Sequence, residues 1–349
     1  MSPHDVVMPV TWIRAPQRRC CVLLFFCIGV LLPACSIIPA GMRAPTSPQL
    51  SAEAMQVRLL DVSYPLLTAA AEWCPFDQEP TYGFLLREER QGEGPEQNPV
   101  QGRAVVAYVH PRLPAAVAGL SVDDVILSVN TVSVSGEPTG AVGRLIDRAT
   151  RAKIQPLQLN VLTGGRPRTL SMSAIQACHY SMRVVDSDII NGVTDGRRIG
   201  VTSGALRFFP SHDELGWIIA HEIAHNILHH VQNAKLQAMV RAFLAARGEN
   251  AVSADAMPSM PSRESQADYV GAYLMGRAGY DLSAIKRVWE RLQWIETRQG
   301  GRRSSLALTH PPTKERLAAF DVTLQEIEAK RRLGQPLEIL VEDPAAVSP

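Results

Sequence analysis

The 349-residue sequence predicts an α+β fold made of a mainly helical unit and a small β-rich unit inserted into it. Apolar residues recur at helical spacing in 51–73 and again from residue 211 onward. Between these stretches, short β-branched runs at 105–109, 125–129 and 157–162 are separated by Gly, Pro and Asn. The change from a helical period to short extended runs and back indicates that one unit interrupts the other.

The composition is that of an ordinary globular protein and indicates no highly charged partner. Hydrophobic residues make up 46% of the chain and charged residues 20%, and 35 Lys and Arg against 34 Asp and Glu leave a net charge of +1. Because such a chain has no strong field of one sign, we do not expect it to bind nucleic acid.

Residues 1–34 are predicted to be an export signal. Several arginines precede an apolar run from Cys20 to Leu32, and the run ends in Leu-Pro-Ala followed by Cys35. The apolar run is too short to span a bilayer as a mature helix, and its charged flank is typical of secretory signals. Its end resembles a bacterial lipobox, which implies that Cys35 becomes a lipid-modified N-terminus. An ordinary cleaved signal is the alternative.

The mature chain is expected to be held at a membrane by this lipid only. Residues 35–50 are rich in Pro, Ala and Ser and are expected to form a tether. Ser36 follows the cysteine, which by resemblance to Gram-negative lipoproteins favours the outer membrane. No later segment approaches the roughly 18 consecutive apolar residues of a spanning helix. We therefore expect a periplasmic, lipid-anchored protein.

Cys74 and Cys178 are predicted to form a disulfide. The other four of the six cysteines lie at or before position 35, so these two remain in an oxidising compartment. Two buried free thiols are the alternative, because the sequence does not give the Cα separation. The pair flanks the β-rich insert, so a bridge would close the insertion point.

Two further segments are expected to fold with the helical unit. The helix predicted at 51–73 contains Pro65, which we expect to kink or break it. The segment 180–206 carries β-branched runs with turn signals at Asn191-Gly192 and Asp195-Gly196. This pattern predicts a small β hairpin.

The insert resembles the PDZ domains of bacterial quality-control proteases. The resemblance lies in the run from Leu113 to Asn130 and implies a domain over about 81–175. Such domains bind a C-terminal peptide as an added strand beside a nest of backbone amides, for which Gly83, Phe84 and Leu85 are the candidate residues. A PDZ fold whose groove is closed, or only packs on its neighbour, is the alternative.

A helix beginning near Ser211 is predicted to carry the chemistry. Ser211 and Glu214 have the spacing of a capping box, and an apolar helical pattern follows. His221 and His225 are four residues apart, so on a helix both imidazoles project from one face, close enough to bind one Zn²⁺. With Glu222 between them they form the His-Glu-x-x-His pattern of a metalloprotease.

A catalytic zinc site usually has three protein ligands and an open position, so one more donor is needed. Glu264 is the best candidate, and a helix places Asp268 on the same face one turn later. Asp268 can then accept the outer N–H of a ligating imidazole and fix its orientation. The predicted ligands of one Zn²⁺ per chain are therefore His221, His225 and Glu264.

These motifs, with a late His-Pro at His310, resemble the HtpX and CAAX-prenyl-endopeptidase family of gluzincin metallopeptidases. The resemblance implies a zincin metallopeptidase domain over 51–80 and 176–335, followed by a tail at 336–349. Without transmembrane helices, the nearer branch is that of exported lipoproteins with a BepA-like catalytic domain. In the family the matching histidine either stabilises the oxyanion or occupies the open metal position in a resting form. A loop histidine without a role is the alternative for His310.

The resemblance implies a zinc-dependent endopeptidase. Zinc would lower the pKa of a water, and Glu222 would take its proton as the water attacks a peptide carbonyl. The expected substrates are unfolded or misassembled envelope proteins, since the chain to be cut has to lie extended against the β edge at 180–206. The alternative is a non-proteolytic PDZ binding protein or chaperone with a structural or latched zinc site.

Two other features are expected beside the site. The segment from Gln232 to Ser262 is predicted to cover the cleft until a ligand moves it. His229 and His230 follow the zinc helix and are expected to be solvated or packed rather than to bind metal.

Overall fold

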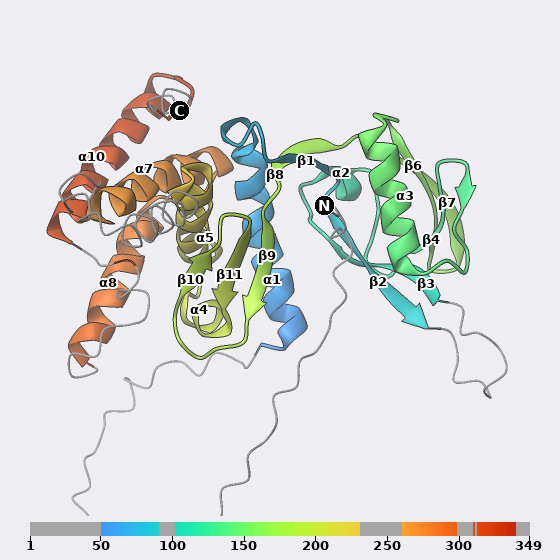
Figure 1. Cartoon of the computed structure of the whole chain (residues 1–349), viewed down its shortest axis with the longest axis horizontal. Helices are drawn as coiled ribbons and strands as arrows, with labels where there is room; N and C mark the ends of the chain where they lie inside the picture. Colours follow the sequence, from blue (N-terminus) through green and yellow to red (C-terminus); the bar gives the residue numbers. More distant parts are fainter. Residues whose placement is uncertain (1–49, 91–101, 231–259, 299–309, 311–312, 340–349) are drawn as a thin grey trace, which may run out of the picture.

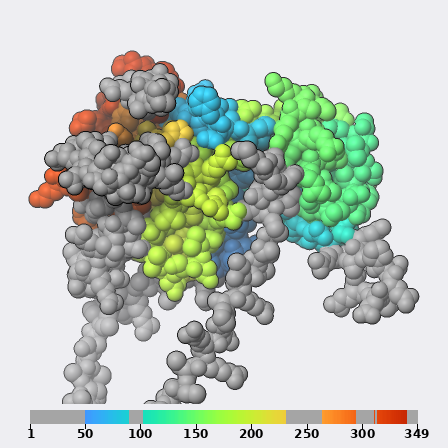
Figure 2. Space-filling view, viewed as in Figure 1, coloured from blue at the N-terminus to red at the C-terminus, as the bar shows by residue number. Residues whose placement is uncertain are grey.

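The computed structural model describes residues 50–90, 102–230, 260–298, 310 and 313–339. It has two lobes, a helical body and a β-rich lobe, joined by a narrow waist (Figure 1). The space-filling view shows the green β-rich lobe projecting from one side of the body (Figure 2). The predicted mixture of helix and sheet, with a PDZ-like lobe, is thus present. The predicted signal and Cys35 lie outside the described residues.

The β-rich lobe is a single antiparallel sheet with two helices. Its strand order is β2-β3-β4-β6-β7, and the short strand β5 pairs with β4. Buried side chains such as Val106, Ile126 and Leu159 form its own core, separate from that of the body. The elements are β2 Phe84–Arg90, β3 Gly102–Val109, α2 Pro114–Val117, β4 Val125–Val129, β5 Val132–Ser133, α3 Thr139–Arg151, β6 Leu157–Thr163 and β7 Arg166–Met172.

The waist consists of two antiparallel strands and a disulfide. β1 (Gln78–Thr81) pairs with β8 (Ile175–Cys178) along their whole length. Cys74 and Cys178 are disulfide-bonded with a Cα separation of 5.8 Å. The two ends of the inserted lobe are therefore held together at a single point on the body.

The helix α1 (Ala52–Ala69) passes through Pro65 without interruption, so of the predicted kink or break, the break does not occur. Proline removes the N–H that would bond the carbonyl of Asp61. That loss is compensated, since the ring of the buried His110 hydrogen-bonds to the Asp61 backbone. Leu59 and Leu66 on either side of the proline are fully buried, and their packing holds the helix in place. The short helix η1 (Ala71–Trp73) follows.

A three-stranded sheet of the body lies against α1 and α5. Its order is β10-β11-β9, with β9 (Ser181–Val185) parallel to β11 (Arg198–Thr202) and β10 (Gly192–Thr194) antiparallel to it. The predicted hairpin turns at Gly196, where φ is +97°. Gly192 does not form the expected second turn but begins β10.

The remaining helices pack into one core with α1. They are α4 Ser203–Phe208, α5 His212–Ile227, α7 Met260–Ala278, α8 Ser283–Arg298 and α10 Lys314–Arg332. Ser211 caps α5 by accepting from the Glu214 amide at 3.1 Å. The Glu214 carboxylate instead pairs with Arg291 of α8 at 3.0 Å, so only half of the predicted capping box forms. The segment predicted to cover the cleft lies outside the described residues up to 259, and its last residues begin α7.

Candidate metal centre

Three elements distant in sequence bring the predicted site residues together. Helix α5 carries the two histidines and Glu222 of the His-Glu-x-x-His pattern, and α7 carries Glu264 and Asp268. The helices approach closely beside Gly271, where an added Cβ would lie 3.3 Å from the His221 amide nitrogen. His310, which precedes α10, supplies the remaining side chain.

Four donor atoms converge on one point between α5 and α7. His221, His225, Glu264 and His310 each offer one ligand atom, and these atoms lie within 4.8 Å of one another. The two histidine Nε2 atoms are 3.1 Å apart, and the Glu264 carboxylate lies 3.3 Å from the first and 3.4 Å from the second. Bonds of about 2.0–2.1 Å to a tetrahedral ion put the ligand atoms roughly 3.3 Å apart. Both the chemistry and the spacing of these donors therefore fit Zn²⁺.

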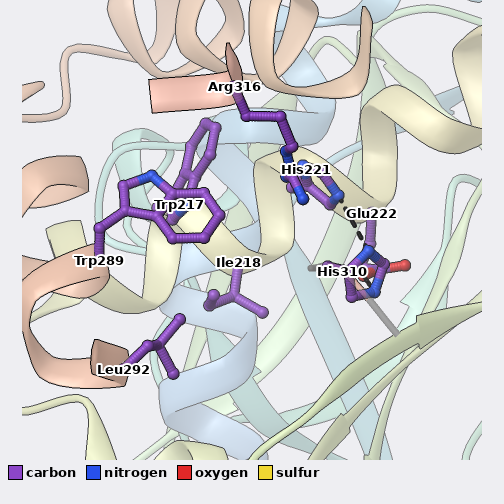
Figure 3. A pocket seen from close by; sticks show the side chains of 8 residues that line it. All are labelled: Trp217, Ile218, His221, Glu222, Trp289, Leu292, His310 and Arg316. Atoms are coloured by element: carbon purple, nitrogen blue, oxygen red, sulfur yellow. Dashed lines mark hydrogen bonds and ion pairs between the residues drawn. The ribbon is translucent and has the colours of Figure 1, made fainter. Parts of the chain in front are cut away.

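His310 lies where a fourth ligand or a substrate group would be. Its Nδ1 is 3.2 Å from His221 Nε2 and 2.9 Å from Glu264 Oε2. Its Nε2 is 3.3 Å from Glu222 Oε1, so the ring also contacts the predicted base (Figure 3). Burial opposes the charged ring, but the contacts with Glu222 and Glu264 raise the pKa of His310 to about 10.

The carboxylates of the site stay ionised although they are enclosed. Burial opposes the charged form of Glu264, but contacts with His221, His225 and His310 hold its pKa far below the usual range. Burial likewise opposes charge on Glu222, yet His310 and the ligand histidines lower its pKa. Glu222, the predicted base, is 1% exposed, so its carboxylate is enclosed within the protein.

Asp268 and a residue that the sequence did not reveal, Arg316, support the ligands. Asp268 Oδ1 lies 3.1 Å from His221 Nδ1, on the outer side of that ring. Arg316 donates two hydrogen bonds to Asp268, at 2.7 and 2.8 Å, and its third nitrogen is 3.3 Å from Glu264. Arg316 is 2% exposed. Because α10 contains many charged residues, its sequence has no apolar pattern that would indicate which arginine is buried.

His230 packs, as predicted, but it does so against His225, one of the predicted metal ligands. Its Nδ1 lies 3.0 Å from His225 Nδ1, and its Nε2 lies 3.1 Å from the side-chain oxygen of Gln266 on α7. Burial, with the neighbouring His225, lowers the pKa of His230 to about 4, so the ring is neutral near pH 7. A neutral ring here orients His225, whereas His229 is only partly buried.

The candidate peptide groove of the second lobe runs between β2 and α3. Phe84 and Leu85 line a cavity of about 230 Å³ there, whereas Gly83 forms the preceding turn with φ at +80°. The far wall of this cavity belongs to the body and includes Tyr64 of α1 and Tyr180, just before β9. The groove is therefore a cavity shared by both lobes.

Comparison with protein families assigns a class to each lobe. Residues 168–323 match the model of peptidase family M48, and residues 105–155 match a PDZ domain model. Residues 168–323 are thus similar to metallopeptidases of family M48, and a central part of the second lobe is similar to a PDZ domain.

The chain is similar to mitochondrial metalloendopeptidases named OMA1. The chain is 30% identical to the Schizosaccharomyces pombe protein over 179 residues. This match covers 47% of this chain and 52% of the relative. The Arabidopsis thaliana protein is 29% identical over 155 residues, covering 41% of this chain and 31% of the relative. This chain therefore spans about half the length of the first relative and less of the second.

Among solved structures, the HtrA3 PDZ domain bound to a phage-derived ligand is similar to part of this chain. The match covers 29% of this chain and 88% of the HtrA3 chain. The identity is 19% and the TM-score 0.23. Among the helices that the structure describes, none has the length and apolar character needed to cross a membrane.

Replacing Asp268 by Asn is expected to weaken Zn²⁺ binding about 10- to 100-fold, because the amide removes the charge that orients His221. Competition with a chromogenic chelator measures the affinity. The matched control is Asp188→Asn, since the Asp188 side chain is fully exposed. Equal affinities of Asp268→Asn and the unsubstituted protein would refute the supporting role.

Proposed function

We propose that this protein is an endopeptidase that cuts unfolded or misassembled cell-envelope proteins, with Zn²⁺ as its metal and Glu222 as its general base. The observation that supports the proposal is the group of three donors, His221, His225 and Glu264, spaced for one ion beside a buried, ionised Glu222. A structural zinc site needs no such base.

The residues of the site have separate tasks in hydrolysis. Bound Zn²⁺ supplies a Lewis acid that acidifies water and polarises the substrate carbonyl. Glu222 accepts the proton of the attacking water and then donates it to the leaving amide nitrogen. Asp268 and His230 hold the rings of His221 and His225 from behind, so the ligands need not reorganise during the reaction.

The substrate is proposed to lie along β10, the edge of the three-stranded sheet nearest the metal site. An extended peptide pairs with the free backbone groups of an edge strand, which favours unfolded segments. Gly192 opens this strand, and a Cβ there would lie 2.9 Å from Ile218 and 3.2 Å from Glu222 Cγ. A glycine is needed because the strand runs directly over the base.

His310 is proposed to hold the enzyme in a resting form. With its Nδ1 near the other three donors, it stands at the fourth corner of the site, where water has to enter. This position favours a role of His310 as a latch on the metal over a role as an oxyanion donor. It is also the one observation that supports the non-proteolytic alternative, in which the zinc site is closed. A ligand or substrate would then have to displace His310 before cleavage.

The remaining expectations on cell biology stay proposals. We propose an exported lipoprotein of the BepA-like branch, attached through Cys35 on the periplasmic face of the outer membrane. The relatives are mitochondrial by name, and the support for export of this chain is the lipobox-like run that ends at Cys35. Labelled palmitate should be incorporated into the unsubstituted protein but not into the Cys35→Ser variant. Incorporation that persists in the variant would overturn the proposal that Cys35 carries the lipid.

The PDZ lobe is proposed to take the C-terminus of a substrate or regulator. The support is the cavity beside β2, an edge strand to which a peptide can add. Peptide binding that is unchanged by truncation of Phe84 would contradict this assignment.

Glu222→Gln is expected to keep Zn²⁺ but to lose cleavage of an unfolded substrate such as casein by at least about 100-fold, because the amide cannot accept a proton. Metal content and casein turnover are measured on the same preparation. Undiminished turnover would remove Glu222 from its role, and absence of activity in the unsubstituted, zinc-loaded protein would favour the binding-protein alternative.

Gly192→Ala is expected to lower kcat about 10- to 100-fold, because a shift of β10 or of the Glu222 side chain by about 1 Å misaligns the reacting groups. Zinc content should not change. Gly140→Ala is the control, since a Cβ there approaches nothing closer than 3.4 Å. Equal rates in both variants would mean that β10 does not position the substrate.

His310→Ala is expected to raise basal casein cleavage severalfold, because it frees the fourth corner of the site. Initial rates with zinc-saturated protein measure the effect. A fall in the rate would show that His310 acts as an oxyanion donor rather than as a latch.

A further inference from the structure

The cavity between the two lobes combines apolar walls with two carboxylates. It measures about 230 Å³, an order of magnitude more than the roughly 10–15 Å³ that one water molecule needs. Most of its wall is apolar and comes from α1, β2 and α3 together, but Glu79 and Asp147 also line it. Glu79 belongs to β1 in the waist, and Asp147 belongs to α3 of the β-rich lobe. The cavity therefore offers both an apolar surface and a pair of acids to one ligand.

Little positive charge faces these two carboxylates. His179 Nε2 lies 3.2 Å from Glu79, which is the only contact of either acid with a basic side chain within the described parts of the chain. Burial raises the pKa of Glu79, and Asp147 adds to the rise, while His179 and Arg151 oppose it. Burial raises the pKa of Asp147 as well, again against Arg151 and His179. A further cation placed beside acids in this condition stabilises them.

A buried hydroxyl in the same cavity is unpaired. Ser63 of α1 lines the cavity and is fully buried, and its Oγ has no hydrogen-bond partner among the residues that the structure describes. An unpaired buried hydroxyl is unfavourable, so a ligand that brings a polar group to it gains affinity. An ammonium or guanidinium group carries several N–H donors, and Ser63 with the two carboxylates supplies acceptors for them. The hydroxyl thus indicates a ligand independently of the acids.

The two acids lie at the end of the cavity where the candidate nest of backbone amides begins. Thr150 follows Asp147 by one turn of α3, and its Oγ1 lies 3.1 Å from the Tyr82 hydroxyl. Tyr82 directly precedes Gly83, the first residue of that nest, and β1 with Glu79 leads into the same turn. A terminal carboxylate held there would face two groups of its own charge, and like charges repel. A positive charge on the last residue of the peptide would offset this repulsion.

We propose that the cavity receives the side chain of a lysine or arginine at the C-terminus of a bound peptide, with its charged head beside Glu79 and Asp147. The inference rests on the proposed role of the β-rich lobe in binding C-termini and names the class of peptide. The aliphatic stem of either side chain runs along apolar walls such as Leu67 of α1 and Ile146 of α3, while the head stays with the acids.

Other last residues bind less well for two different reasons. An aspartate or glutamate adds a third negative charge to a partly buried place. A leucine fills the apolar part of the cavity, but it shields Glu79 and Asp147 from water without giving them a counter-charge.

The test measures peptide binding to the full chain carrying Glu222→Gln, so that no peptide is cut. Fluorescent peptides of one sequence differ only in the last residue, which is Lys, Arg, Leu or Glu, and anisotropy gives each Kd. The Kd for Lys and Arg is expected to be about tenfold lower than that for Leu and about a hundredfold lower than that for Glu. Equal or tighter binding of the Leu peptide overturns the inference and leaves C-terminal binding by this lobe intact.

Amidation of the Lys peptide separates the inference from the function on which it rests. The amide is expected to raise the Kd, because the nest loses the carboxylate that it binds. A Kd that amidation does not change, together with a retained preference for Lys over Leu, would count against C-terminal binding alone and support the basic side chain in the cavity.

Asp147→Asn is expected to reduce the preference for Lys over Leu about fivefold, because one of the two acids is lost. The preference is the ratio of two Kd values within one variant, so a lower fraction of folded protein cancels. Asp123→Asn is the matched control, since that carboxylate is on the same lobe, is 73% exposed and lies outside the cavity. An unchanged ratio in Asp147→Asn, or an equal loss in the control, would contradict the inference.

Ser63→Ala gives a second readout in a variant that should fold. Removal of an unpaired buried hydroxyl is not expected to lower the melting temperature. The Kd of the Lys peptide should rise about threefold, while that of the Leu peptide should stay the same, because only the charged head uses the hydroxyl. Equal changes for both peptides would remove Ser63 from the proposed site.

Discussion

The structure depends on the neutralisation of three carboxylates inside the contact between α5 and α7. Glu222, Glu264 and Asp268 lie among buried side chains, where an unpaired charge is costly. Imidazoles face two of them from within the site, and Arg316 approaches from α10 with paired hydrogen bonds. A cation held by the donors would complete this balance. The charges therefore hold three distant segments at one point, and they would at the same time create the conditions for the proposed hydrolysis.

The helix α1 connects this centre to the PDZ lobe. Arg58 donates to the Phe209 carbonyl at 2.5 Å, in the turn that leads into the metal helix. One turn further on, Asp61 accepts from Tyr108 of the PDZ lobe at 2.8 Å, and Tyr64 stacks on the same ring at a centroid distance of 6.1 Å. Since α1 also walls the groove, a peptide bound there would contact the element that braces the start of α5.

Local patterns anticipated much of this arrangement. Spacing on a helix placed His221, Glu222 and His225 correctly relative to one another, because such spacing depends only on the helical period. Asp268 follows Glu264 by the same rule. The β-rich insert was visible in the change of period, and its flanking cysteines are joined in the structure. Pro65 does not break α1, because packing that a local rule ignores supports the helix.

Residue types and their spacing thus predicted the candidate donors that the structure brings together and the order of the two lobes. Tertiary structure alone decided which remote groups complete the site: Arg316 behind Asp268, His230 behind His225 and Gly192 over Glu222. The physical reason is that periodicity reports which face of an element is buried, whereas contacts between elements depend on packing and charge that no single segment contains.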